Sequence, residues 1–253
     1  MKNKRLRIVL YILCMGALIP VGAILIRDPI FMDSQERRYP DSFFSSYSSN
    51  GAFRFDVETI LEALQQGETN SFVPIDATSG TQNYEGIAEW KQADYLLIAN
   101  ALHQFLWGET TDDWNLNDMS FLGKCNDQFV FDIAKISYAK PIGLQEYRFH
   151  MIGIYPRAGE GEWGGSDFPR SLFERQYFID KEKLAIELED ALQIAENNGG
   201  AQARLNVNDR CSVSVSLSPY PYPQWEISYS LVPTRIFEIK INAYTGEFEV
   251  LER

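Results

Sequence analysis

The chain has 253 residues, a formal net charge of −12, 45% hydrophobic residues and 13% aromatic residues. This composition is typical of a folded protein with a substantial hydrophobic core, and it excludes disordered and fibrous chains. Four of the 23 basic residues and no acidic residue precede the first apolar segment, so the remaining chain is more acidic than the whole, which argues against nucleic-acid binding.

The first apolar segment covers residues 8–26 and contains no charged residue. As an α-helix it would extend about 28 Å, close to the hydrocarbon thickness of a bilayer. The basic tail, residues 1–7, predicts a cytoplasmic N-terminus by the positive-inside rule. A cleaved signal peptide and a lipoprotein signal that uses Cys14 are the alternatives, and both would also export the domain. We therefore expect a single-pass anchor in the cell membrane and an extracytoplasmic C-terminal domain.

A first folded unit is predicted after the anchor. Residues 27–55 are rich in serine with scattered aromatic residues, which is typical of a tether. Apolar residues at helical spacing predict one helix from Asp56 and a second within 90–107, which Gly108 ends. Strand-like runs with alternating apolar residues follow. These elements predict a first α+β unit over residues 56–165.

A second α+β unit is predicted over residues 166–253. Asp180 is the expected cap of an amphipathic helix, and the run Asn197–Gly200 is its expected end. Apolar residues then alternate with polar ones, as in a strand that is covered on one face. The strand-like runs are 211–217, 225–231 and 237–241.

Two segments of the chain resemble each other. Residues 152–160 and 239–247 share two isoleucines and a Gly-Glu pair at the same spacing, and the preceding predicted helices are separated by a similar interval. This similarity predicts a tandem repeat, and a chance recurrence of two hairpin ends is the alternative. The predicted fold class is α+β: an N-terminal transmembrane helix followed by two tandem units, each a helix with an antiparallel sheet.

Few residues suggest metal or redox chemistry. Cys125 and Cys211 are the only cysteines outside the apolar segment, and an oxidising compartment favours a disulfide between them. Two unpaired buried thiols are the alternative. His103 and His150 would complete a set of four zinc ligands, but the close ligand pairs of a structural zinc site are missing. Ordinary packing or a surface position is the expectation for both histidines, and we predict no metal and no cofactor.

The aromatic run Pro219–Pro223 reads Pro-Tyr-Pro-Tyr-Pro and separates two predicted strands. Exposed aromatic residues are common in protein contacts, so Tyr220, Tyr222 and Trp225 are the candidate contact residues. A stiff connection between two strands, without a binding role, is the alternative.

The C-terminal third resembles a PepSY-type domain. The residues that carry the resemblance are Trp225–Tyr229 (WEISY) and the closing hairpin Ile239–Glu247 (IKINAYTGE). The resemblance covers about residues 178–253, and Asn242 stands where the family often has aspartate. It implies an exported module with a helix on an antiparallel sheet that binds or restrains a partner, with peptidase regulation as the role. It brings no catalytic residue.

No nucleophile elbow, phosphate-binding loop or metalloprotease motif occurs in the chain. We therefore predict a non-enzymatic, membrane-anchored binding or regulatory protein whose partner is another envelope protein, such as a peptidase. One alternative is an accessory subunit of a membrane complex, held by residues 8–26. Another is an envelope hydrolase that uses carboxylates between the two units.

Overall fold

The computed structural model describes residues 48–54, 57–67, 90–125, 129–142, 146–169 and 178–251. The predicted basic tail and anchor, together with residues 27–47 of the predicted tether, lie outside the described residues. The prediction of a tether is wrong for residues 48–54, which form a strand of the sheet and pair with residues 160–166. Within the described ranges, no helix is both long enough and apolar enough to cross a bilayer.

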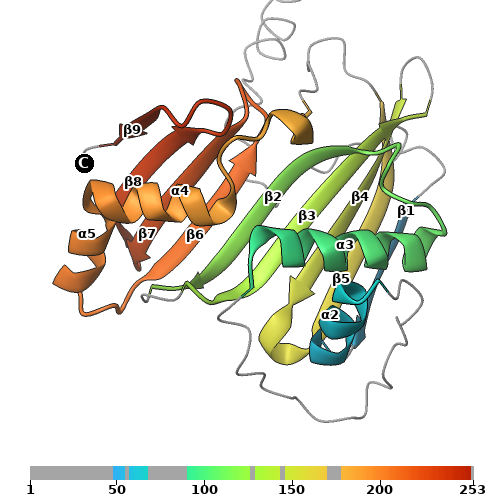
Figure 1. The fold of residues 1–253 in the computed structure, drawn as a ribbon, viewed down its shortest axis with the longest axis horizontal. Helices are drawn as coiled ribbons and strands as arrows, with labels where there is room; N and C mark the ends of the chain where they lie inside the picture. Colours follow the sequence, from blue (N-terminus) through green and yellow to red (C-terminus); the bar gives the residue numbers. More distant parts are fainter. Residues whose placement is uncertain are drawn as a thin grey trace, which may run out of the picture. The chain divides into compact units, whose positions relative to one another are not determined.

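One antiparallel sheet of nine strands organises the described chain, in the order β1-β5-β4-β3-β2-β6-β7-β8-β9 (Figure 1). The strands are β1 (Ser48–Arg54), β2 (Asn115–Lys124), β3 (Phe131–Pro141), β4 (Glu146–Tyr155), β5 (Glu160–Pro169), β6 (Ser212–Ser218), β7 (Gln224–Leu231), β8 (Thr234–Asn242) and β9 (Phe248–Val250). The α-helices are α2 (Val57–Gln65), α3 (Gln92–Trp107), α4 (Leu188–Ala195) and α5 (Ala201–Asn206). This mixture of helices and antiparallel strands confirms the predicted α+β class.

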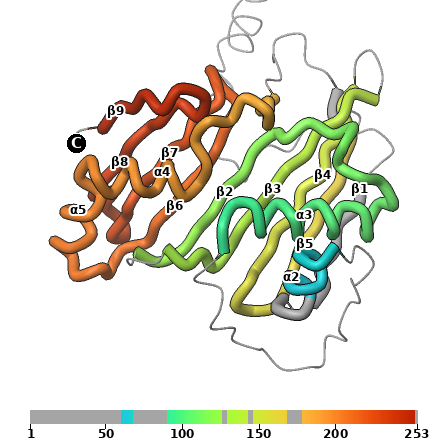
Figure 2. Tube along the Cα trace, viewed as in Figure 1, coloured from blue at the N-terminus to red at the C-terminus, as the bar shows by residue number. Residues whose placement is uncertain are grey.

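The two helix-and-strand segments share a single sheet because β2 pairs with β6. Met119 lies opposite Leu217 and Phe121 lies opposite Val215, so apolar side chains continue across the seam. In the trace of Figure 2, this seam lies between α3 and α4. Pairing of the two strands satisfies backbone groups that would otherwise lie at sheet edges. The sequence contains no signal for this pairing, and a continuous sheet was not predicted.

Alternation in β6 places its side chains on two different faces. Val213, Val215 and Leu217 are buried, whereas the intervening serines face the other side of the sheet. The strands β7 and β8 follow the same alternation through residues such as Ile227 and Ile239, both fully buried. The apolar face is the one that the helices cover (Figure 1). The predicted strands of this segment therefore follow from the period-two pattern.

Helix α3 ends at Gly108, as predicted. Gly108 adopts the left-handed conformation with φ of 70°, and its N–H donates to the carbonyl of Gln104 at 2.8 Å. Glycine adopts this conformation without the steric cost of a Cβ atom. At the other end, the Asp94 carboxylate accepts a hydrogen bond from the backbone N–H of Lys91 at 2.9 Å.

The predicted boundaries of the second-unit helix are wrong at both ends. Asp180 caps only the short 3₁₀ turn Lys181–Lys183, because Ala185 and Ile186 donate their N–H groups to the Ala243 carbonyl and hold the next residues extended. Helix α4 therefore begins at Leu188. At the far end, the π turn Glu196–Gly200 bends the chain, and α5 continues beyond the predicted stop.

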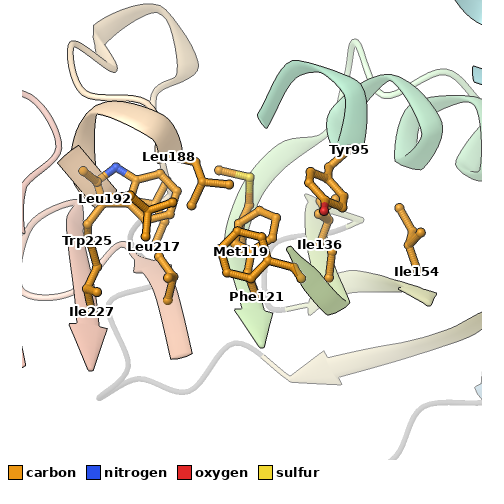
Figure 3. Close-up of a cluster of buried hydrophobic side chains, with 14 of the residues drawn as sticks. Tyr95, Met119, Phe121, Ile136, Ile154, Leu188, Leu192, Leu217, Trp225 and Ile227 are labelled. Carbon is orange, nitrogen blue, oxygen red and sulfur yellow. The ribbon is translucent and has the colours of Figure 1, made fainter. Parts of the chain in front are cut away.

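A single hydrophobic core runs beneath α3 and α4 and across the seam (Figure 3). On one side, Leu188 and Leu192 of α4 pack near Trp225. On the other side, the rings of Tyr95 and Phe121 meet edge to face at 5.2 Å between centroids. Full burial of each large apolar side chain stabilises a fold by about 1.5–3 kcal/mol, so both helices are held mainly by this core.

Candidate functional site

A disulfide closes the seam between β2 and β6. Cys125 directly follows β2, Cys211 directly precedes β6, and their Cα atoms are 5.2 Å apart. The N–H of Cys125 also donates to the carbonyl of Cys211 at 2.9 Å. Because both sulfurs are bonded to each other, neither cysteine is a thiolate ligand, and the zinc set formed with His103 and His150 is excluded. Within the described ranges, no group of three or more metal-ligating side chains occurs.

The aromatic hairpin between β6 and β7 exposes two of its three candidate contact residues. Tyr220 is 67% exposed and Tyr222 is 49% exposed, whereas Trp225 is fully buried. Trp225 lies opposite Leu217 on the helix-covered face, and its indole N–H donates to the carbonyl of Ile186 at 2.9 Å. The prediction of Trp225 as a contact residue is therefore wrong, because strand alternation turns it into the core.

The closing hairpin of the PepSY-like segment is held by a local network of hydrogen bonds. The Asn242 side-chain oxygen accepts the N–H groups of Tyr244 at 2.9 Å and Thr245 at 3.2 Å. Gly246 has φ of 75°, and its N–H donates to the Asn242 carbonyl. Ala243 donates to the carbonyl of Pro223, so this turn also supports the base of the aromatic hairpin. The motif is a structural turn that positions the neighbouring loop.

A buried histidine pair lies between α3 and β4, in the half of the sheet without the PepSY likeness. His103 and His150 are 0% and 1% exposed, and Nδ1 of His150 lies 2.9 Å from Nε2 of His103. Nδ1 of His103 lies 2.9 Å from the carbonyl oxygen of Glu109. The rings of Trp107 and Trp114 stack against His150, with centroids at 3.8 Å and 4.2 Å. The prediction of ordinary packing missed this pair because 47 residues separate the two histidines.

Burial is the main electrostatic effect on the histidine pair. Burial, with smaller contributions from His103 and Arg148 and against the opposing effect of Asp167, lowers the pKa of His150 to about 3. Burial also lowers the pKa of His103, against the opposing effect of its hydrogen bond to the Glu109 carbonyl. Both rings are therefore neutral at neutral pH.

Among the carboxylic acids in the described ranges, Asp118 has a raised pKa, and burial is the main cause. It accepts hydrogen bonds from Asn117 at 2.8 Å and from Ser137 at 3.3 Å. A hydrolase of the predicted kind needs two carboxyl groups that act together. Asp118 is hydrogen-bonded to an amide and a hydroxyl rather than to a second carboxyl group, so this acid does not favour the hydrolase alternative.

The fold and these sites define a helix-on-sheet protein with an exposed aromatic hairpin on a rigid base. Residues 185–249, which run from just before α4 into β9, match the family described as Peptidase propeptide and YPEB domain, or PepSY. This match confirms the predicted resemblance of the C-terminal part. No curated protein matches the chain.

Two solved structures are similar to this chain at a low level. One is the dehydratase domain from the CurK module of curacin polyketide synthase, at 11% identity and a TM-score of 0.23, covering 80% of this chain and 90% of that chain. The other is an inactive mutant of the CurK dehydratase, at 11% identity and a TM-score of 0.21, covering 80% and 89%. TM-scores at this level do not indicate a common fold.

Proposed function

We propose that this chain is a membrane-anchored, extracytoplasmic, non-catalytic protein that binds and restrains a peptidase or another envelope protein. The observation that supports it is the match of residues 185–249 to the PepSY family, whose domains generally act in peptidase propeptide or inhibitor-like regulation. The apolar segment 8–26 with its basic flank supports the anchor and the orientation. The net charge of −12 favours a partner with a basic contact surface.

The proposal includes two tandem units, which the sequence predicts over residues 56–165 and 166–253. The predicted boundary falls inside β5, which continues to Pro169, so the first unit ends after that strand. In the first, α3 precedes β2 to β5, and in the second, α4 and α5 precede β6 to β9. Gly159 and Gly246 both have positive φ and both stand just before the last strand of their segment. This correspondence of order and turn supports a repeated module.

The proposed contact surface is the aromatic hairpin, through Tyr220 and Tyr222. Tyrosine offers a large, rigid and amphipathic contact area at a small loss of conformational entropy. Three prolines restrict the loop, and the hydrogen bond from Ala243 to the Pro223 carbonyl fixes its base. The exposed rings are therefore presented with little ordering cost on binding.

The test is affinity capture of the full-length chain from gently solubilised native membranes, beside a version whose residues 8–26 are replaced by another apolar helix. A partner retained by both versions, and lost with the double variant Tyr220→Ala and Tyr222→Ala, is the expected result. The matched control carries Leu205→Ala and Val232→Ala, which remove apolar groups that are 56% and 87% exposed outside the hairpin. The control is expected to retain the partner.

Two other results separate the alternatives. A partner that is lost when only residues 8–26 are replaced identifies an accessory subunit that is held through its membrane helix. Absence of a specific partner with both versions contradicts the binding proposal and makes the hydrolase alternative the next to test.

A further inference from the structure

The hydrogen bonds of the histidine pair fit one arrangement of protons. The Glu109 carbonyl oxygen only accepts, so His103 carries its hydrogen on Nδ1 and donates it there. Nε2 of neutral His103 is then an acceptor, and His150 donates to it from Nδ1. The neutral pair thus connects β4 to α3 and to the loop that follows α3.

Protons disturb this arrangement in two steps. The first proton places a positive charge in a site where the two rings are 0% and 1% exposed, away from solvating water. The second proton makes hydrogen-bond donors of both nitrogens that face each other at 2.9 Å, so the bond between His103 and His150 is lost. An open state, in which water solvates the imidazolium groups, does not carry these costs.

The surroundings compensate a positive charge only in part. Among the residues that the structure describes, the charged groups that act on the pair are Glu109 after α3, Lys140 on β3, Arg148 on β4, Asp167 on β5 and Lys181 in the 3₁₀ turn. Arg148 donates two hydrogen bonds to Asp167 at 2.8 and 3.0 Å, and Lys140 lies 3.5 Å from Glu109. Both facing carboxylates thus already have a cationic partner, and Lys181 adds a further positive charge.

We propose that His103 and His150 form an acid-sensitive latch, which holds α3 against β4 while both rings are neutral and releases it when protons are taken up. Helix α3 packs directly on β3 and β4, so the pair lies within the contact that would open. Both histidines of the chain belong to this half, which confines the response to α3 and its surroundings.

The direction of the pH effect follows from linkage. Because both pKa values are lower in the closed state, the closed state is fully favoured above about pH 6.5 and loses stability as the pH falls. Each histidine that is protonated only in the open state raises the open population up to about tenfold per pH unit. The pair together gives up to about 100-fold per unit. Stacking of Trp107 and Trp114 on an imidazolium opposes this change.

The test is amide hydrogen exchange of the full-length chain in detergent between pH 7.5 and 4.5, corrected for the intrinsic pH dependence of exchange. Exchange in peptides from α3 is expected to rise steeply below pH 6.5, while peptides from α4 in the same sample serve as the internal control and stay protected. Since the chain contains two histidines, a histidine-free affinity tag leaves only their imidazole signals for NMR titration. Both signals are expected to stay in the neutral form until α3 opens.

The double variant His103→Leu and His150→Phe replaces both rings by apolar groups that cannot take up a proton, and it removes the imidazole donor of the Glu109 carbonyl at every pH alike. Its α3 exchange is expected to be flat over the same pH range. Imidazole signals that titrate near pH 6.5 while α3 stays protected overturn the proposal, and so does a double variant that keeps the wild-type pH response. If the double variant does not fold, the imidazole titration of the wild-type chain alone decides between latch and inert packing.

Discussion

The indole N–H of Trp225 donates a hydrogen bond to the backbone carbonyl of Ile186 at 2.9 Å, across the interior of the PepSY-like segment. Trp225 belongs to β7 and Ile186 to the extended residues before α4, so the bond ties the sheet to the entry of the helix. The same entry is held by the Ala243 carbonyl, which accepts the N–H groups of Ala185 and Ile186. Trp225 and the Ala243 carbonyl therefore together hold the residues that precede the covering helix.

Replacement of Trp225 by phenylalanine is expected to reduce the free energy of unfolding by about 2–4 kcal/mol. The variant leaves the Ile186 carbonyl without its indole donor and leaves a cavity where the larger ring stood. Urea denaturation measures the change. Tyr222→Phe is the control, since that ring is 49% exposed, and it is expected to leave stability nearly unchanged. An equal effect of both substitutions contradicts the role assigned to Trp225.

Removal of the disulfide by Cys125→Ser and Cys211→Ser is expected to cost about 4 kcal/mol, because the bond closes a long loop in the unfolded chain. Urea denaturation with and without a thiol reductant provides the measurement. The wild-type midpoint is expected to fall in the reductant, whereas the midpoint of the double variant stays constant. A wild-type midpoint that does not respond to complete reduction would show that the bond does not stabilise the seam.

Glu196 is expected to be a sensitive carboxylate of the second half. It accepts hydrogen bonds from Tyr229 and Arg204, both at 2.8 Å, and only 13% of its side chain is exposed. Glu196→Ala leaves both donors without this acceptor, and we expect a loss of about 2–3 kcal/mol. Glu226→Ala is the matched control, since its ion pair with Lys240 is 4.0 Å long and well exposed. Its effect on the urea midpoint is expected to be close to zero.

Gly200 is expected to tolerate no side chain. A Cβ atom there would lie 2.8 Å from the Ala195 carbonyl oxygen and 3.0 Å from the Tyr229 ring. Gly200→Ala is therefore expected to destabilise the protein by about 1–3 kcal/mol. Gly164→Ala is the control, because its Cβ would meet only the end of Met151, at 3.8 Å. Thermal melting of both variants checks the difference, and equal melting temperatures would contradict the close approach.

Alkaline pH is expected to destabilise the fold through its buried tyrosines. Burial raises the pKa of Tyr95, Tyr138 and Tyr229 above the ordinary value of 10.0. The stability that these groups contribute is complete below pH 10 and is lost as the pH rises further, by about 1.4 kcal/mol per unit for each tyrosine. Denaturation at increasing pH measures the slope. Tyr95→Phe is expected to reduce this slope by about 1.4 kcal/mol per pH unit. Tyr222→Phe is expected to leave the slope unchanged, because Tyr222 is exposed.

Local patterns in the sequence were sufficient for several elements. The period-two alternation around Val213 and Val215 predicts a strand covered on one face, and Gly108 predicts the end of α3. The residues Ile239–Glu247 predict the PepSY likeness of the last segment, which the family match confirms. These features depend on residues that are neighbours along the chain, so the pattern itself contains the physical cause.

Other features depend on residues that meet only after folding. The helix predicted from Asp180 begins at Leu188 instead, because the distant Ala243 carbonyl holds the intervening residues extended. Local spacing could not reveal this contact. Trp225 differs, because it shares the period-two alternation of Ile227 and Tyr229, so the strand pattern already indicated its burial and the choice of Trp225 as a contact residue disregarded that pattern.

The sequence by itself thus determined the composition of a folded acidic domain, the alternating strands, the turn residues and the likeness of the C-terminal part to PepSY domains. The tertiary structure alone decided that β2 pairs with β6 in one sheet and that His103 meets His150 beneath α3. The physical reason is that helix ends and strand faces follow from short-range sterics and periodicity. Strand order and buried polar contacts follow from the packing of a core that involves the whole chain.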